Sequence, residues 1–159
     1  GQDTAGSQRR FEGFIADAMR EHLVERPLRG KAVKNRYWTL HGNSALDLNL
    51  SEMGGNTIKR AHRGNSDAVV LMLSGKGCFV TWPDGAWQKN IQVPWRDGTL
   101  VAAPIYWYRQ FLNFGDEASR NLTFSAKLLV ENLGIRFLDQ MENDLPEIRK
   151  IWSKYLGSG

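Results

Sequence analysis

The sequence predicts a single, mainly β domain with a helix near each end. Its 159 residues are a usual length for one domain, and 42% of them are hydrophobic. Between Tyr37 and Phe124, short apolar or alternating runs are separated by turn residues, a spacing typical of a β-sandwich or barrel. On both sides of this region the apolar residues recur at helical intervals instead.

Helical periodicity predicts the first helix over residues 11–25. Its apolar residues recur at three- and four-residue intervals: Phe11, Phe14, Ile15, Met19 and Leu23. Pro27 ends this helix, because a proline disfavours helix in the residue before it. A second amphipathic helix is predicted to begin at Pro146 and to end at Gly157. The resulting division is a flexible lead-in over 1–10, a helix and linker over 11–36, a barrel over 37–130 and a helical tail over 131–159.

The strands are predicted from shorter patterns. Residues 45–50 alternate between apolar and polar, whereas residues 68–73 form a continuous apolar run. Residues 78–82 follow that run after the turn Ser-Gly-Lys-Gly, so the two segments are predicted to pair as a hairpin. Further strands are expected over residues 99–104, 109–114 and 121–129.

Composition narrows the possible partners. The net charge of +4 is spread along the chain, whereas proteins that bind nucleic acid more often concentrate basic residues in a stripe. No run of 18 apolar residues occurs, so no membrane span is expected. A single cysteine, Cys78, forms no internal disulfide and favours a reducing compartment. We therefore expect a cytoplasmic protein with no nucleic-acid or membrane partner.

Two segments carry a resemblance to the cupin superfamily. Residues 62–77 (HRGNSDAVVLMLSGKG) resemble the first cupin motif, and residues 98–113 (GTLVAAPIYWYRQFLN) resemble the second. Gly75, Gly98, Pro104 and Asn113 match the glycines, proline and asparagine that frame these motifs. The resemblance implies a double-stranded β-helix, which is a jelly-roll barrel.

The metal ligands of the family match less well. Cupins commonly hold a divalent metal with two histidines of a His-x-His pair, a glutamate and a later histidine. His62 matches the first histidine, but Gly64 takes the place of the second, Asp67 falls near the glutamate, and Arg109 replaces the later histidine. A guanidinium has donors and no acceptor, so it does not bind a cation. The resemblance therefore implies no cofactor, with one divalent metal such as iron near His62 as the alternative.

The substitutions favour an anion in place of the metal. Strand alternation puts Arg109, Phe111 and Asn113 on one face, and the register of the family makes that face the barrel interior. Arg109 is then expected to clamp a small organic carboxylate, with Asn113, Phe111 and Trp107 also contacting the ligand. The alternative is an internal Arg109–Asp67 ion pair that fills a disused site.

A catalytic interpretation uses the same region. Metal-free sugar epimerases of the cupin superfamily resemble this chain in having a His–Asp pair and a tyrosine. His62 with Asp67 is the expected base, and Tyr106 or Tyr108 the expected acid. His41 is the other histidine expected near the barrel mouth.

Three functions remain open on these grounds. The first is a metal-free isomerase, cyclase or lyase that transfers a proton on a small anionic substrate. The second is a ligand-binding or structural cupin without catalysis, and the third is a metal-dependent dioxygenase with substituted ligands. A homodimer is expected in each case, because the predicted helix over residues 11–23 has more apolar surface than one small barrel covers.

Overall fold

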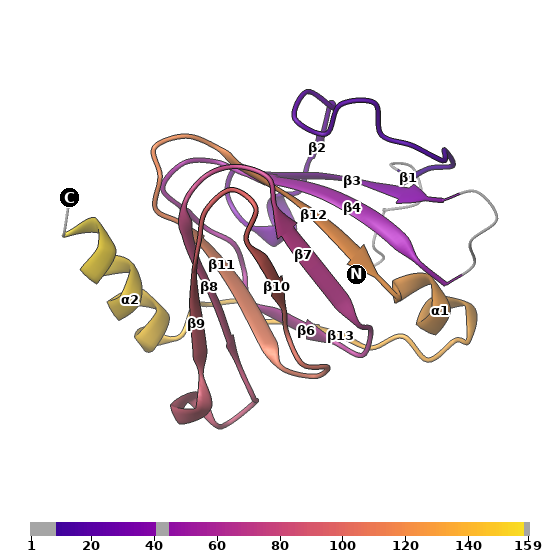
Figure 1. The fold of residues 1–159 in the computed structure, drawn as a ribbon. Helices are drawn as coiled ribbons and strands as arrows, with labels where there is room; N and C mark the ends of the chain where they lie inside the picture. Colours follow the sequence, from indigo (N-terminus) through magenta and orange to yellow (C-terminus); the bar gives the residue numbers. More distant parts are fainter. Residues whose placement is uncertain (1–8, 41–44, 158–159) are drawn as a thin grey trace.

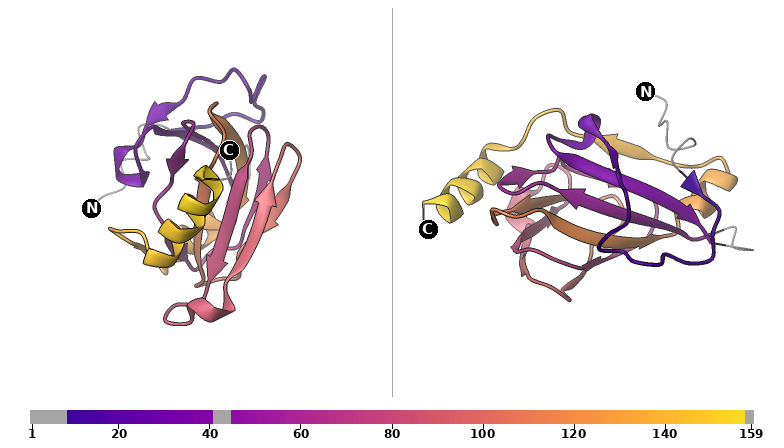
Figure 2. Two further views of the ribbon diagram at one scale, coloured as in Figure 1. Left: turned by 90° about the vertical axis from the view of Figure 1, so that its left-hand side faces the viewer. Right: turned by 90° about the horizontal axis from the view of Figure 1, so that it is seen from above.

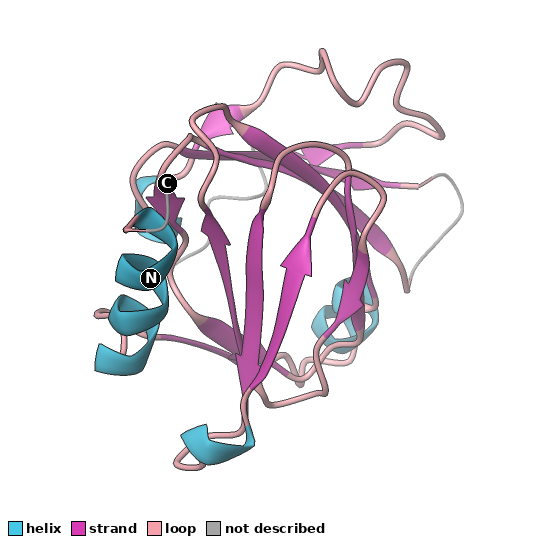
Figure 3. Ribbon diagram, turned by 60° about the vertical axis from the view of Figure 1, so that its left-hand side comes forward, coloured by secondary structure: helices cyan, strands magenta, loops and turns pink. Residues whose placement is uncertain are grey.

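The computed structural model describes residues 9–40 and 45–157. Two β-sheets face each other and form a barrel, with helices at its periphery (Figures 1 and 3). His41 and most of the expected lead-in over residues 1–10 lie outside the described residues. The mainly β jelly-roll prediction is confirmed.

The seven-stranded sheet runs β1-β3-β4-β12-β7-β10, with β2 also paired to β3. Its members are β1 (Arg9–Arg10), β2 (Val24–Glu25), β3 (Val33–Thr39), β4 (Asp47–Met53), β7 (Ala68–Met72), β10 (Leu100–Ala102) and β12 (Ser119–Ser125). The six-stranded sheet runs β13-β6-β11-β8-β9, with β5 also paired to β11. Its members are β5 (Thr57–Ile58), β6 (His62–Gly64), β8 (Gly77–Trp82), β9 (Ile91–Trp95), β11 (Tyr108–Asn113) and β13 (Leu138–Gln140).

The described residues also include two α-helices and two short 3-10 helices. These are η2 (Pro27–Arg29), η3 (Trp87–Lys89), α1 (Lys127–Asn132) and α2 (Pro146–Leu156). The C-terminal helix predicted from Pro146 is therefore confirmed. None of the helices in the described part of the chain is long and apolar enough to cross a membrane.

Apolar side chains from both sheets fill one part of the barrel interior. Phe79, Trp95 and Phe111 come from the six-stranded sheet, and their rings pack at centroid distances of 5.1 Å for Phe79–Phe111 and 5.9 Å for Trp95–Phe111. Val70 and Met72 reach the same cluster from β7 in the opposite sheet. Burial of these side chains stabilises the two sheets against each other.

The predicted helix over residues 11–25 is absent, and this expectation was wrong. The Asp17 carboxylate accepts hydrogen bonds from the backbone N–H groups of Met19 (2.9 Å) and Arg20 (3.2 Å), which forms a turn in place of a helical repeat. The irregular segment passes over the outer face of the seven-stranded sheet (Figure 2). Ile15 and Leu23 pack there, whereas Phe11 and Phe14 are each 68% exposed, so only part of the apolar pattern reflects burial. The homodimer expected through this segment stays a prediction.

The predicted hairpin of residues 68–73 and 78–82 is also wrong. β7 pairs with β12 and β10, whereas β8 pairs with β11 and β9 in the other sheet. The turn between them therefore connects the seven-stranded sheet to the six-stranded sheet. Gly77 allows this connection, because a Cβ there would overlap the backbone oxygen of Leu112 and the ring of Trp95. Two adjacent apolar runs with a glycine turn do not by themselves show which sheet each strand joins.

The remaining boundaries differ in smaller ways. The strand expected over 121–129 ends at Ser125 and is followed by α1. The sheets also extend past the expected barrel limits of 37–130, since β3 begins at Val33 and β13 starts at Leu138.

Helix α2 covers the outer face of the six-stranded sheet. Ile148 is fully buried there against Val80 and Leu112, whereas Leu156 at the end of the helix is 47% exposed. We predict that Ile148→Ala lowers the free energy of unfolding by about 2–5 kcal/mol, through lost burial and the cavity left behind. Leu156→Ala is the matched control, with a change of about 0.5 kcal/mol or less. Urea unfolding measures both, and equal effects would contradict the packing of α2.

Candidate functional site

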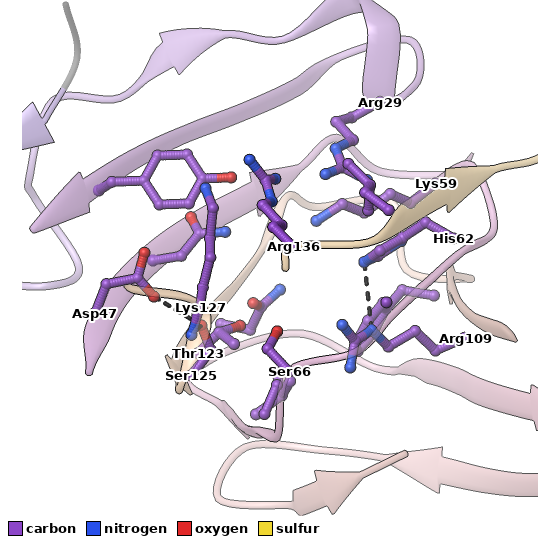
Figure 4. A pocket seen from close by; sticks show the side chains of 18 of the residues that line it. Arg29, Asp47, Lys59, His62, Ser66, Arg109, Thr123, Ser125, Lys127 and Arg136 are labelled. Carbon is purple, nitrogen blue, oxygen red and sulfur yellow. Dashed lines mark hydrogen bonds between the residues drawn. The ribbon is translucent and has the colours of Figure 1, made fainter. Parts of the chain in front are cut away.

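A cavity of about 100 Å³ lies between the two sheets, next to the apolar core. Phe111 and Val70 border both the core and the cavity. Figure 4 shows Arg29, Lys59, His62 and Arg109 along one wall, facing Asp47, Lys127 and Ser125 across the space. A buried water needs roughly 10–15 Å³ of such space, so the cavity has room for several waters or a small organic molecule.

Strand pairing places Arg109 and His62 side by side. Arg109 lies in the middle of β11 and is the register partner of His62 on the short strand β6. The Nε–H of Arg109 donates to Nε2 of His62 at 3.3 Å, which leaves the proton of the neutral ring on Nδ1. Burial lowers the pKa of His62 well below its usual value, and the charges of Arg29, Arg109 and Lys59 lower it further. His62 is therefore neutral at physiological pH.

Lys59 lies between β5 and β6 and is 7% exposed. Its backbone N–H donates to the carbonyl oxygen of Phe111 (3.0 Å), and its Nζ donates to Oγ of Ser51 at 3.0 Å. Burial lowers the pKa of Lys59 to about 7, with further lowering by the positive charges of Arg29, Arg109 and Arg26 in that order. A buried amine beside cations loses its proton easily, because charge on it is poorly solvated and repelled.

Arg29 reaches the same wall from η2. Gly30, which follows it, has φ +140°, and a Cβ there would lie 3.2 Å from the backbone oxygen of Ile58. The N–H of Arg60 donates to the carbonyl oxygen of Arg29 (2.8 Å), and Nη1 of Arg29 donates to Oε1 of Gln140 (3.1 Å). These contacts hold η2 against the Lys59 segment.

The charge on this wall is not balanced by carboxylates. Within residues 9–40 and 45–157, no acidic side chain forms an ion pair with Arg29, Lys59 or Arg109. Burial and the charge of Arg29 lower the pKa of Arg109 to about 10, so it keeps its proton. We call Arg29, Lys59 and Arg109 the cationic cluster.

The opposite wall is closer to neutral. Asp47 is fully buried, and its carboxylate accepts from Oγ of Ser125 (2.7 Å) and pairs with Arg9 (3.4 Å). Lys127 lies 4.3 Å from the centroid of the Tyr37 ring, and both Lys127 (3.6 Å) and Arg136 (2.8 Å) pair with Glu131. Among the described residues, the cations of the cavity that have no acidic partner are therefore those of the cationic cluster.

Several expected site residues do line the cavity. Arg109 and Phe111 face inward from β11, as strand alternation predicts, and His62 lies beside them. Asn113 shares their face but has a structural role. Its Nδ2 donates to the carbonyl oxygens of Gly54 and Glu117, each at 2.9 Å, and its Oδ1 accepts from the N–H of Gly115 (3.1 Å). The amide of Asn113 holds a turn, and the residue is not part of the cavity lining.

The expected partners of His62 lie elsewhere. Asp67 has an exposed side chain outside the cavity lining, so neither the His62–Asp67 pair nor the Arg109–Asp67 ion pair forms. The turn between β6 and β7 carries Asp67 away from the interior, and the N–H of Ala126 donates to its carbonyl oxygen (2.9 Å). The position of Asp67 near the glutamate of the first cupin motif therefore did not predict where its side chain points.

Tyr106 and Tyr108, the expected acids, also lie outside the cavity lining. Tyr106 is 54% exposed, and its ring contacts Phe137 at a centroid distance of 5.8 Å. Tyr108 alternates with Arg109 on β11 and points to the outer face, where its hydroxyl donates to Oδ2 of Asp139 at 2.6 Å. Burial, followed by that hydrogen bond, raises the pKa of Tyr108 to about 12. Trp107 precedes this strand and does not line the cavity.

Sequence reasoning missed Lys59 and Arg29. The available signal was the basic run Lys-Arg-Ala-His-Arg over residues 59–63, which surrounds His62. It does not show which side chains point inward, because β5 and β6 are short and interrupted. Arg29 came from a segment expected to be a linker.

The residues at the metal position of the cupin resemblance do not fit a divalent cation. Gly64 has no donor side chain, and the guanidinium of Arg109 and the amine of Lys59 lie beside His62. In the described ranges, no three His, Cys, Asp or Glu side chains gather into a possible metal site. Three protein ligands are usual for a catalytic metal, and a single histidine among cations does not supply them.

The two facing sheets match solved structures of cupins. No family model and no curated protein sequence matches this chain. A cupin-2 domain protein from Rhodospirillum rubrum is 17% identical, with a TM-score of 0.55 over 79% of this chain and 74% of that one. The expected cupin fold is therefore confirmed.

Salicylate 1,2-dioxygenase from Pseudaminobacter salicylatoxidans is similar as well. It has a TM-score of 0.60 and 10% identity over 70% of this chain and 31% of its own. A form with gentisate adducts also has a TM-score of 0.60, with 12% identity over 77% of this chain and 31% of its own. The present chain thus spans about a third of the length of those enzymes. Identities this low show a shared fold and nothing about the reaction.

We predict that the purified chain carries far less than one equivalent of transition metal, because its donor set is one neutral histidine among cations. Elemental analysis of protein purified without chelator or affinity metal measures this. A full equivalent of iron, nickel, manganese or zinc that disappears in His62→Ala would contradict it.

Proposed function

We propose that the chain binds a small organic carboxylate inside the barrel, with Arg109 as its principal contact. The observation that carries the proposal is the cationic cluster, whose members have no acidic partner in the described residues. Buried cations are costly unless paired, and an anionic ligand would supply the missing partner. A guanidinium binds a carboxylate through two parallel hydrogen bonds, which suits Arg109 to this role.

The cavity supports a small ligand with an apolar part. Phe111 and Val70 form an apolar border next to Arg109, while Thr123 and Asn121 add polar groups from β12. Ligand sites commonly combine an apolar wall with a few polar groups that fix orientation. A small carboxylate with a short carbon skeleton satisfies both parts, whereas an inorganic anion would leave the apolar wall unused.

A metal-free enzyme is the second candidate, and one residue favours it. His62 is poorly placed as the base, because the guanidinium of Arg109 already occupies its Nε2 lone pair. Lys59 offers a buried amine with a pKa lowered to about 7, a value suited to proton transfer near neutral pH. An isomerase or lyase of this kind would use Lys59 and dispense with Asp67, Tyr106 and Tyr108. The side chains around His62 do not supply the ligands of a divalent metal, so they do not favour the dioxygenase alternative.

We predict that Arg109→Ala weakens binding of small carboxylates by about 2–5 kcal/mol, because it removes the charged partner from a buried pair. Arg109→Lys should recover only part of this loss, since an ammonium lacks the planar fork. Thermal shift over a panel of carboxylates identifies a binder, and calorimetry then measures its affinity.

Arg96→Ala is the matched control for this experiment. Arg96 is exposed in the turn between β9 and β10, outside the cavity lining, so its loss should leave the affinity unchanged. Inorganic phosphate and sulfate distinguish a carboxylate site from a general anion site. Equal affinity of wild type and Arg109→Ala for every carboxylate that binds would overturn the proposal.

A further inference from the structure

The amine of Lys59 is held in place inside the cavity. Its Nζ donates to Oγ of Ser51, whose hydroxyl in turn donates to the carbonyl oxygen of Lys34 at 3.4 Å. The Nζ also lies 5.8 Å from the centroid of the Phe111 ring. These contacts fix the position of the amine, and none of them is with a carboxylate that would hold the proton on it.

The amine and the proposed carboxylate site share one wall. Phe111, which Lys59 contacts through its backbone and its amine, lies two residues after Arg109 on the same face of β11. Figure 4 shows Lys59 between Arg29 and His62, with Arg109 beside His62. A ligand whose carboxylate meets Arg109 would lie in the same small cavity as the amine of Lys59, so its neighbouring carbon atoms can approach that amine.

The surroundings of Lys59 are those of a nucleophilic lysine. Desolvation and neighbouring cations are the two influences that activate a lysine amine toward carbonyl carbon, and both act here. A carbonyl group adjacent to the carboxylate would lie at the carbon nearest to this amine. Among carboxylates, the 2-oxo acids have that arrangement.

We propose that Lys59 forms an imine with a 2-oxo acid whose carboxylate is held by Arg109. The inference rests on the proposed carboxylate site and names its substrate class. The neutral Nζ attacks the ketone carbon, the electron pair of the C=O bond moves to oxygen, and a proton passes from nitrogen to that oxygen. The resulting carbinolamine loses its hydroxyl with the second amine proton as water, and a carbon–nitrogen double bond forms. Nothing is oxidised or reduced.

Reductive trapping tests this step. The intact chain is incubated with pyruvate and sodium cyanoborohydride, which reduces an imine to a stable secondary amine, and is then examined by mass spectrometry. We expect one adduct per chain, with the mass of one pyruvic acid less one oxygen atom, and peptide mapping should locate it at Lys59. An adduct spread over several exposed lysines, or none at all, would overturn the proposal.

Variants identify the reacting amine. Lys59→Met and Lys59→Arg should each reduce trapping to the background seen without pyruvate. Lys59→Arg retains a positive charge at this position, so it serves as the second variant in case Lys59→Met does not fold. Lys89→Met is the matched control, because Lys89 is exposed on η3 and should not affect the adduct. Arg109→Ala should lower trapping by pyruvate by a larger factor than trapping by acetone, because acetone has no carboxylate for Arg109 to hold.

Propionate separates failure of this inference from failure of the carboxylate site. Propionate has a carboxylate but no ketone, so it can occupy the proposed carboxylate site but cannot form an imine. If propionate or pyruvate binds in an Arg109-dependent manner and no adduct forms, the imine is refuted and the carboxylate site stands. If neither binds and no adduct forms, both are refuted.

Discussion

Like charges gathered on one wall of a small cavity are the constraint that shapes this protein. Arg29, Lys59 and Arg109 arrive from three separate segments and meet on one wall of the barrel. Lys59 is buried and the two arginines beside it are partly buried, so their charges are less well solvated than in water, and their mutual repulsion adds to that cost. A fold can reduce the cost by releasing a proton from one of them or by holding an anion. Lys59 releases its proton readily, and an anion would complete the site, so both proposed properties have the same origin.

Strand alternation along β11 connects this site to the rest of the fold. Arg109 and Phe111 face the cavity, whereas Tyr108 and Gln110, which alternate with them along the strand, face outward. Nε2 of Gln110 donates to Oδ1 of Asp144 (2.6 Å), and the other oxygen of that carboxylate pairs with Arg149 of α2 at 2.6 Å. The helix is thereby attached to the back of the strand that carries Arg109. A rigid strand keeps the guanidinium in place without an acidic neighbour.

The sequence predicted features that depend on local periodicity, and it did not predict features that depend on contacts between distant segments. Alternation placed Arg109 and Phe111 on the inner face correctly, and the helix at Pro146 followed from its own pattern. The apolar spacing over residues 11–25 looked helical, yet the segment is irregular: Ile15 and Leu23 pack on a sheet, whereas Phe11, Phe14 and Met19 are exposed. The spacing of apolar residues alone therefore established neither a helix nor which of them are buried.

The site was only partly predictable for the same reason. His62 and Arg109 were found because the resemblance aligned them, whereas Lys59 and Arg29 lie outside both motifs and reach the cavity through tertiary contacts such as the hydrogen bond between Arg60 and Arg29. Asp67 was included because it falls near the glutamate of the first cupin motif. A turn of a few residues reversed the direction of its side chain, and no local pattern shows that.

The pH dependence of folding stability tests the buried charge most directly, without any ligand. The pKa of Lys59 is lowered to about 7 in the folded chain from 10.5, so between these values the unfolded chain binds the extra proton. Stability therefore rises with pH in this window, by about 1.4 kcal/mol per pH unit from this group. Urea unfolding between pH 7 and 9 should show this rise in wild type relative to Lys59→Met, a difference that cancels groups common to both. Parallel pH profiles for the two proteins would contradict the account, because Lys59 would then titrate as an ordinary lysine.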